Sequence, residues 1–171
     1  MRVPTCSIVL AGSIIALAGC ASDTTTPTGL QAPSKQSSQR GPEMSKFNLE
    51  VILRGDGFGL VKFRQPKDDA LIINLDTKVR GLEPNTAYVL QRAADTNLDG
   101  ICSSTSWLTL GKGLVPQTIT TDDRGTGEES LFRDVTALGV GATFDIAFRV
   151  VKVETGAVVL TSECYRYTIS Q

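Results

Sequence analysis

The stretch that decides the fold is FNLEVILRGDGFGLVKFRQ, residues 47–65. Apolar and polar residues alternate in both of its halves. One face of the first half carries Phe47, Leu49, Val51 and Leu53, and one face of the second half carries Val61 and Phe63. A period of two is typical of a strand with one buried face, and the Gly-Asp-Gly at 55–57 is typical of a tight turn. The stretch therefore predicts two antiparallel strands joined as a hairpin.

The same alternation continues to the end of the chain, and no segment has an apolar stripe with the 3.6-residue period of a helix. Turn sequences separate the alternating segments, and DDRGTG at Asp122–Gly127 and ETGA at Glu154–Ala157 predict hairpin connections. The further alternating segments are 70–81, 86–93, 107–111, 118–122, 128–135, 144–153 and 158–169. We predict an all-β protein, an antiparallel Greek-key β-sandwich of eight or nine strands in two sheets packed face to face.

Composition excludes several classes of function. The chain of 171 residues has 17 basic and 18 acidic residues without a block of like charge, so we expect no nucleic-acid partner. It has no histidine. That excludes Ser-His-Asp and Cys-His nucleophile systems and removes the commonest ligand of zinc and copper. We therefore expect a protein that is not an enzyme and that needs no cofactor, with calcium as the exception discussed below.

The N-terminus reads MRVPTCSIVLAGSIIALAGC, residues 1–20. Arg2 precedes an apolar core, about Ile8 to Leu17, that is too short to span a hydrocarbon layer of about 30 Å. The end of this run, Leu17-Ala18-Gly19-Cys20, resembles the lipobox of bacterial lipoprotein signal peptides. The resemblance implies that residues 1–19 are removed and that Cys20 carries a diacylglyceryl group that anchors the protein to a membrane. A plain secretory signal is the alternative.

Residues 20–45 follow as the lipidated N-terminus and a tether rich in Ser, Thr, Pro and Gln, which we expect to be disordered. Ala21 follows the cysteine, without the aspartate that would indicate retention in the inner membrane. The expected location is the cell envelope: the outer membrane of a Gram-negative cell, or the outer face of the plasma membrane of a Gram-positive cell. The β-sandwich domain is predicted to span residues 46–171.

Two of the four cysteines remain for the mature domain, because Cys6 belongs to the signal peptide and Cys20 to the lipid. In a compartment where thiols oxidise, Cys102 and Cys164 are expected to form a disulfide that closes a loop of some sixty residues. Metal ligation by the two thiolates is the alternative, but no second Cys or His lies at ligand spacing from either.

Three segments, VILRGDGFGLVKFRQ, VRGLEPNTAYVLQRAAD and DGICSS, together resemble the first half of copper/zinc superoxide dismutases. The similarity covers most of residues 47–169 and is faint after Trp107, and Cys164 lies where that family has its second disulfide cysteine. The resemblance implies a dismutase-like fold. The family's two copper histidines match Val89 and Gln91, which cannot replace an imidazole at copper, so dismutase activity is not expected.

A second resemblance competes with the first. GLEPNTAYVL, residues 81–90, is similar to the tyrosine corner of fibronectin type III domains, which implies an immunoglobulin-like sandwich. In that family the tyrosine hydroxyl bonds a nearby backbone group. In either fold Tyr88 is expected to be a core residue at a corner.

The sequence DTNLDG, residues 95–100, has the first half of a calcium-binding loop. Asp95, Asn97 and Asp99 supply oxygens at positions 1, 3 and 5, and Gly100 permits the turn at position 6. Position 12 is Ser106 instead of a bidentate glutamate. One interpretation is a calcium site completed by a carboxylate from elsewhere, namely Asp122, Asp123 or Glu163. The other, which we favour, is an Asx-type turn that orders the loop before Cys102.

These observations favour a non-catalytic, lipid-anchored envelope protein whose β-sandwich is a binding or structural module. Its expected partners are the membrane, through the lipid on Cys20, and an envelope protein or glycan. The alternative is a metal-dependent module, either calcium-bound at DTNLDG or a divergent superoxide dismutase relative. Trp107 beside the loop is expected in the core, with a ligand-stacking role as the alternative.

Overall fold

The structure is a computed structural model that describes residues 48–66 and 69–170. These residues form twelve strands and one short 3-10 helix, so the all-β prediction is confirmed. The eight longer strands are β1 (Asn48–Gly55), β2 (Phe58–Arg64), β3 (Ile72–Arg80), β4 (Ala87–Asp95), β9 (Gly127–Asp134), β10 (Thr143–Lys152), β11 (Val158–Ser162) and β12 (Tyr165–Thr168). The two-residue strands are β5 (Leu108–Thr109), β6 (Gly111–Lys112), β7 (Val115–Pro116) and β8 (Ile119–Thr120), and the 3-10 helix is η1 (Thr136–Leu138).

The predicted signal peptide, Cys20, the tether and the domain boundary at residue 46 all lie outside the described residues. Within the part of the chain that the structure describes, no helix has the length and the hydropathy that crossing a membrane requires.

The strands form one continuous sheet in the order β5-β4-β10-β11-β1-β2-β3-β9-β6-β7, with β12 paired to β10 and β8 paired to β4. The prediction of two separate antiparallel sheets with eight or nine strands is corrected in three respects, the first being that the described residues form twelve strands. β1 pairs with β2 on one side and with the end of β11 on the other, so the sheet is not divided. β6 also pairs with β9 in parallel. The alternation of apolar and polar residues indicates where a strand lies in the chain but not which strands pair with it. For this reason the sequence did not predict the order of the strands in the sheet.

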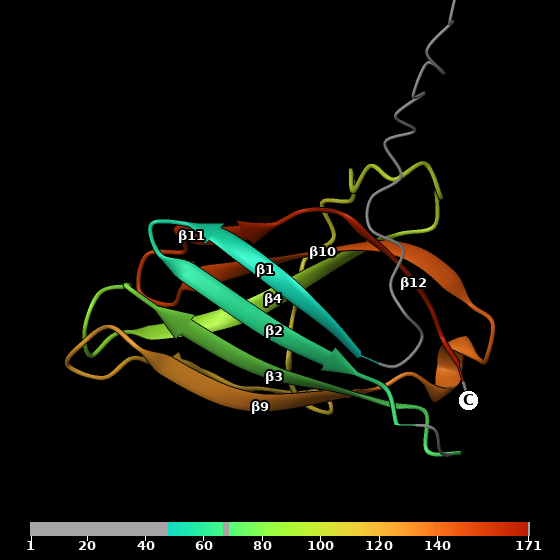
Figure 1. Ribbon diagram of the computed structural model, residues 1–171, viewed down its shortest axis with the longest axis horizontal. Helices are drawn as coiled ribbons and strands as arrows, with labels where there is room; N and C mark the ends of the chain where they lie inside the picture. Colours follow the sequence, from blue (N-terminus) through green and yellow to red (C-terminus); the bar gives the residue numbers. More distant parts are fainter. Residues whose placement is uncertain (1–47, 67–68, 171) are drawn as a thin grey trace, which may run out of the picture. The chain divides into compact units, whose positions relative to one another are not determined.

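The sheet is strongly curled. β4 is second and β3 is seventh in the order of ten strands, yet only residues 81–86 connect them. Figure 1 shows β1, β2, β3 and β9 in one layer with β4 and β10 behind it. The segment Leu108–Thr120 lies between the two ends of the curled sheet, since β5 and β8 pair with β4 while β6 pairs with β9. We call the region between β4 and β9, together with Leu108–Thr120, the seam.

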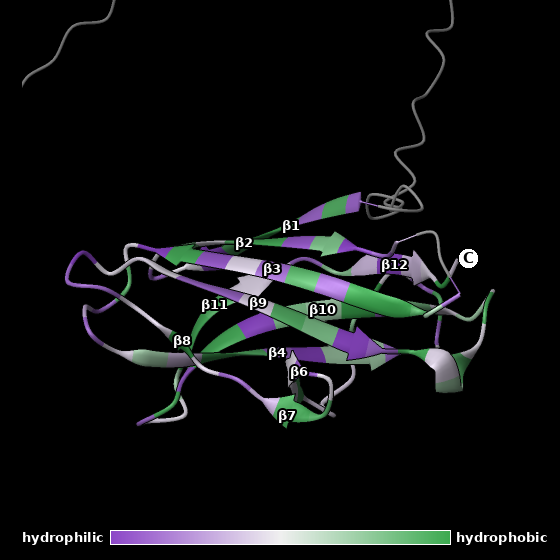
Figure 2. Ribbon diagram, turned by 90° about the horizontal axis from the view of Figure 1, so that it is seen from below, coloured by the Kyte–Doolittle hydropathy of each residue, from purple (hydrophilic) through white to green (hydrophobic). Residues whose placement is uncertain are grey.

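The core fills the inside of the curl. Val51, Leu53, Val61 and Phe63 are buried as predicted, whereas Leu49 is partly buried and Phe47 lies outside the described residues. In Figure 2 hydrophilic and hydrophobic bands alternate along the length of the long strands. The aromatic rings of Phe63 and Tyr167 meet edge to face, with centroids 4.6 Å apart. This packing of alternate residues from every long strand gives the domain a rigid frame.

Tyr88 occupies the predicted corner. Its side chain is only 1% exposed, and its hydroxyl accepts a hydrogen bond of 3.2 Å from the backbone N–H of Glu83, five residues earlier. The neighbouring turn at residues 122–126 contacts the same corner. There Gly125 has a φ of +73°, and a Cβ on it would lie 2.0 Å from the carbonyl oxygen of Leu82. The predicted turn therefore requires glycine at this position.

Candidate binding site

The DTNLDG loop follows β4, and its carboxylates accept hydrogen bonds from the loop itself. Asp95 Oδ2 accepts from the backbone N–H groups of Ser103 and Ser104 and from the Ser103 hydroxyl, at 2.9–3.1 Å. Asp99 accepts from the backbone N–H of Ile101 at 2.8 Å and from the Asn97 amide at 2.7 Å. The bond from Ile101 to Asp99 is that of an Asx-type turn, and the Asp95 bonds join the two ends of the loop. The Ser103 bonds are also the main reason that the pKa of Asp95 is lowered.

A buried carboxylate fastens this loop to the sheet. Asp145 on β10 is 0% exposed, and its Oδ2 accepts a hydrogen bond of 2.7 Å from the backbone N–H of Gly100. Both of its oxygens also accept from the Arg166 guanidinium on β12, at 2.9 and 3.2 Å. The bonds from Arg166 hold the pKa of Asp145 below its ordinary value, against the opposing effect of burial. Gly100 has a φ of +80°, as the predicted sharp turn requires.

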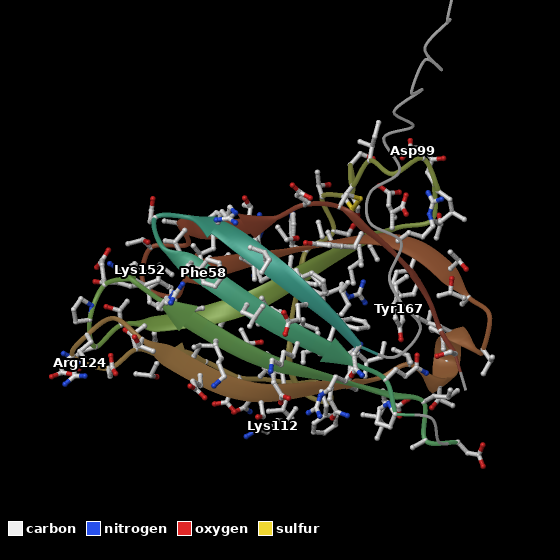
Figure 3. All side chains as sticks on the ribbon, viewed as in Figure 1. Phe58, Asp99, Lys112, Arg124, Lys152 and Tyr167 are labelled. Atoms are coloured by element: carbon white, nitrogen blue, oxygen red, sulfur yellow. A yellow bond between two sulfur atoms is a disulfide. The ribbon has the colours of Figure 1, made fainter. Side chains whose placement is uncertain are left out.

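The structure joins Cys102 and Cys164 in a disulfide, in agreement with the prediction, with Cα atoms 5.4 Å apart. The bond lies beside the loop that carries Asp99, and it is drawn in yellow in Figure 3. The loop between β4 and β5 is thus tied to the rest of the domain by a covalent bond, by Gly100 to Asp145, and by Asp95 to the serines that follow Cys102.

The described residues contain no cluster of three or more Asp, Glu, Cys or His side chains placed to hold a metal ion. Asp122 was one of the residues expected to complete a calcium site with its carboxylate. It instead accepts hydrogen bonds from the backbone N–H groups of Arg124 and Thr126, each at 2.9 Å. The structure therefore does not bring the predicted calcium ligands together with an added carboxylate.

Gln91, which the dismutase resemblance aligns with a copper histidine, lies on the outer surface of the sheet. Its amide oxygen accepts from Arg149 Nε at 2.8 Å, and its amide nitrogen donates to the Thr109 hydroxyl at 3.1 Å. The Arg149 guanidinium lies over the Trp107 ring, 4.1 Å from its centroid. Trp107 is half-buried beneath it, so the expectation that this ring belongs to the core is wrong.

A pocket of about 170 Å³ opens into the curl from the seam. Its inner wall is core, with Phe63, Leu75 and Phe148 each 3% exposed or less. Its exposed lining residues are Thr96, after β4, and Leu138 of η1, which is 54% exposed. Since buried residues form the floor and exposed ones the rim, the mouth lies between the end of β4 and η1.

Two arginines, Arg92 on β4 and Arg133 on β9, line this pocket from opposite sides of the seam. Both occupy inward positions of their strands. Arg92 lies opposite Phe148 in the β4–β10 register, and Arg133 lies opposite Ile73 in the β3–β9 register. Inward positions of a curled sheet are normally apolar, so two charged side chains there need a physical reason.

Neither arginine forms an ion pair with a carboxylate among the described residues. Arg133 donates to the carbonyl oxygen of Gly113 at 3.1 Å. Burial, and then the positive charge of Arg133, lower the pKa of Arg92. Both effects oppose the charged form of Arg92, and a guanidinium nevertheless keeps its charge at neutral pH.

Two acidic residues of β9 pair with lysines, while the pKa of Asp134 is lowered by hydrogen bonds from Thr136 and also by the charge of Arg133. Glu128 pairs with Lys78 at 2.8 Å and Glu129 pairs with Lys112 at 3.1 Å. Asp134 accepts from the backbone N–H of Thr136 at 2.8 Å. The lining of the pocket is almost entirely apolar, and Arg92 and Arg133 contribute little polar surface to it.

Sequence reasoning missed this pocket, although a signal was present. In 86–93 the inward residues Tyr88 and Leu90 are followed at the same spacing by Arg92, and in 128–135 Leu131 is followed by Arg133. A charged residue at an inward position of an otherwise alternating strand indicates either that the strand ends there or that the side chain borders a cavity.

No known family model matches the chain, and no curated protein matches it.

Proposed function

We propose that this protein is a non-catalytic binding module of the bacterial cell envelope, held at the membrane by a lipid on Cys20. The observation that carries the binding role is the pocket at the seam, about 170 Å³ of apolar space within a rigid sheet. Protein interiors are close-packed and few voids exceed the size of a water molecule, so a half-open apolar cavity of this size favours a ligand site.

The non-catalytic part of the proposal is supported by the composition and by the contacts of the acidic residues. The sequence has no histidine. The aspartates of the DTNLDG loop accept hydrogen bonds from their own loop, and Asp145 is bonded to Arg166 and Gly100. Each of these carboxylates accepts hydrogen bonds that order the loop or attach it to the sheet. This also favours the interpretation of DTNLDG as a turn over the calcium-dependent alternative.

The fold proposal remains a dismutase-like variant without a metal site. It is supported by the Gly-Asp-Gly connection between β1 and β2 and by a disulfide that joins the loop after β4 to the residue before β12. Tyr88 at its corner is equally compatible with the immunoglobulin-like alternative.

Anchoring is tested by replacing Cys20 with serine in the full chain. The wild-type protein should be found in the membrane fraction and should incorporate radiolabelled palmitate. Cys20→Ser should lose the label and either leave the membrane or keep its signal peptide, while Cys6→Ser should behave as wild type. A Cys20→Ser protein that is still acylated and cleaved would show that the lipoprotein proposal is wrong.

Binding at the pocket is tested with a small neutral aromatic, because a dry cavity of about 150 Å³ is known to take up benzene. Addition of toluene should shift the methyl NMR signals of Leu75, Leu110 and Ile146, which line the pocket, and leave those of Leu53 and Leu160 unchanged. Equal shifts throughout, or none, would contradict a binding pocket.

A further inference from the structure

We infer that the end of the curled sheet that carries the pocket mouth docks on the surface of a bilayer of zwitterionic lipids, through aliphatic side chains of two loops. These side chains are Leu98 and Ile101 in the loop after β4, and Leu138 and Val140 in the segment before β10. The inference rests on the proposed lipid anchor. It adds an orientation of the domain, because a lipid on Cys20 alone leaves the domain free to turn on a flexible tether.

Both loops leave the sheet at one end, which we call the mouth end. Asp95, the last residue of β4, lies opposite Asp145 near the start of β10. The loop that follows β4 and the segment that precedes β10 therefore leave neighbouring strands side by side. Thr96 of the first and Leu138 of the second line the mouth of the same pocket. The four aliphatic side chains thus belong to loops on the two sides of one opening.

The proposed tether joins the domain at this same end. The described chain starts with Asn48 on β1, which lies opposite Arg64 at the end of β2. The end of β2 lies beside the start of β3, and the start of β3 lies beside the end of β9, just before η1. Figure 1 shows the start of β1 and the orange 3-10 turn at one end of the sheet. A coil of the length of residues 21–47 spans roughly 30 Å, so a lipid on Cys20 keeps the mouth end within reach of the bilayer.

The exposed surface of the two loops suits the interface of a bilayer. The four aliphatic side chains are each 45–64% exposed, and residues 135–143 include no charged residue. Single exposed aliphatic residues are common, but four of them around one opening form an apolar patch, which indicates a contact surface. Docking also brings the mouth of the apolar pocket to the membrane, from which an apolar ligand can enter.

The charge of the loops indicates the kind of lipid. Asp99, between Leu98 and Ile101, is the one charged residue of residues 96–106, and residues 135–142 have none. Attraction to anionic lipids requires a cluster of Lys or Arg, which these loops lack. Docking should therefore depend on apolar burial, which salt does not screen, and a zwitterionic surface should be preferred to an anionic one.

The test measures which methyl groups approach the lipid. The full-length, acylated protein is placed in phosphatidylcholine nanodiscs with a gadolinium-labelled lipid, and the relaxation of its methyl NMR signals is recorded. The enhancement of relaxation at Ile101 and Val140 should be at least fivefold larger than at Val153. Val153 is a matched reference because it is 50% exposed, against 52% for Val140, and follows the other end of β10. Its neighbour Lys152 lies at the end of the sheet opposite Asp99 (Figure 3).

Two double variants separate docking from anchoring. Ile101→Ser with Val140→Ser removes two of the aliphatic side chains, neither of which lines the pocket. Each removal should lower the ratio of docked to free domains roughly fivefold, because partial burial of an aliphatic side chain is lost. Relaxation at Leu138 should fall towards that at Val153, while palmitate incorporation and toluene binding stay unchanged. The control, Leu114→Ser with Val153→Ser, also removes two exposed aliphatic side chains and should dock like wild type.

The outcomes distinguish this inference from the proposed anchor. Equal enhancement at all exposed methyl groups would mean that the domain turns freely on its tether, and enhancement centred on Leu114 or Val153 would place another face on the lipid. Either result overturns the inference and leaves the anchor intact. Stronger docking on phosphatidylglycerol that high salt abolishes would also overturn it, because charge would then drive the contact. A protein that takes up no palmitate and does not enter nanodiscs contradicts the anchor and the inference together.

Discussion

Asp145 connects three parts of the molecule that lie far apart in the sequence. It belongs to β10, it pairs with Arg166 of β12, and it accepts from Gly100 of the DTNLDG loop. A buried carboxylate in such a place is stabilising only while it is ionised and fully bonded. The residue therefore links the order of the loop to pH.

The sign of this pH dependence follows from the lowered pKa of Asp145, for which the Arg166 hydrogen bonds are the main cause. Because the pKa is lower in the folded than in the unfolded state, the contribution to stability is complete above the unfolded value of about 4. It is lost as the pH falls below that value towards the folded pKa. We expect the urea midpoint of the wild type to fall between pH 5 and pH 2.5.

The variant Asp145→Asn separates the pH-dependent stability contributed by Asp145 from that contributed by the exposed aspartates. The variant should be less stable by roughly 2 kcal/mol at pH 7, since it loses hydrogen bonds to a charged partner. The difference between the two proteins should shrink as the pH falls below 4. A difference that stays constant down to pH 2.5 would contradict a role for the ionised carboxylate.

At the scale of elements, the loop between β4 and β5 depends on the disulfide. The two cysteines are 62 residues apart, so the bond restricts a long loop of the unfolded chain. In the chain-entropy treatment this is worth about 4 kcal/mol. Cys102→Ala should lower the free energy of unfolding by roughly 2–5 kcal/mol. The double variant with Cys164→Ala, and the wild type unfolded in reducing agent, should match it; a wild type unaffected by reducing agent would contradict this prediction.

The same loop predicts a weak response to calcium. Calcium modules outside the cell bind at about 10⁻⁴–10⁻³ M, so a titration has to reach tens of millimolar to be decisive. A ligand that binds only the folded state at 100 times its dissociation constant adds about 2.7 kcal/mol. Because Asp95 and Asp99 accept the loop's own N–H groups, we expect no saturable change in melting temperature with calcium or EDTA. A saturable rise that Asp95→Asn abolishes would favour the metal-dependent alternative.

The long strands could be predicted because their alternation is local. The two-residue alternation repeats several times in each of β1, β2 and β3, and Val51, Leu53 and Val61 are buried as expected. β5 to β8 have two residues each, too few to show any period, and they are strands only because β4 and β9 lie beside them. The disulfide could be predicted from the number of cysteines together with the compartment that we expected. The pocket was not, because Arg92 and Arg133 come together only when the sheet curls.

At the scale of the whole molecule, stability should be distributed unevenly. β10 pairs with β4, β11 and β12, whereas the seam segment Leu108–Thr120 is held by pairs of one or two residues. Short pairings open locally at low cost. In hydrogen exchange followed by mass spectrometry, peptides of the seam segment should exchange well before those of residues 146–150. Equal protection of the two regions would contradict a weak seam.

The pairing of β1 with β11 has a consequence for the time at which the domain can form. Leu53 pairs with Ser162, more than a hundred residues later in the chain. At the usual rate of synthesis of about 5–20 residues per second, roughly 5 to 20 seconds pass before β11 exists. During this interval the β1–β2 hairpin has one open edge and an uncovered apolar face, which a chaperone can hold. We therefore expect the sheet to be completed only after its last strands have left the ribosome.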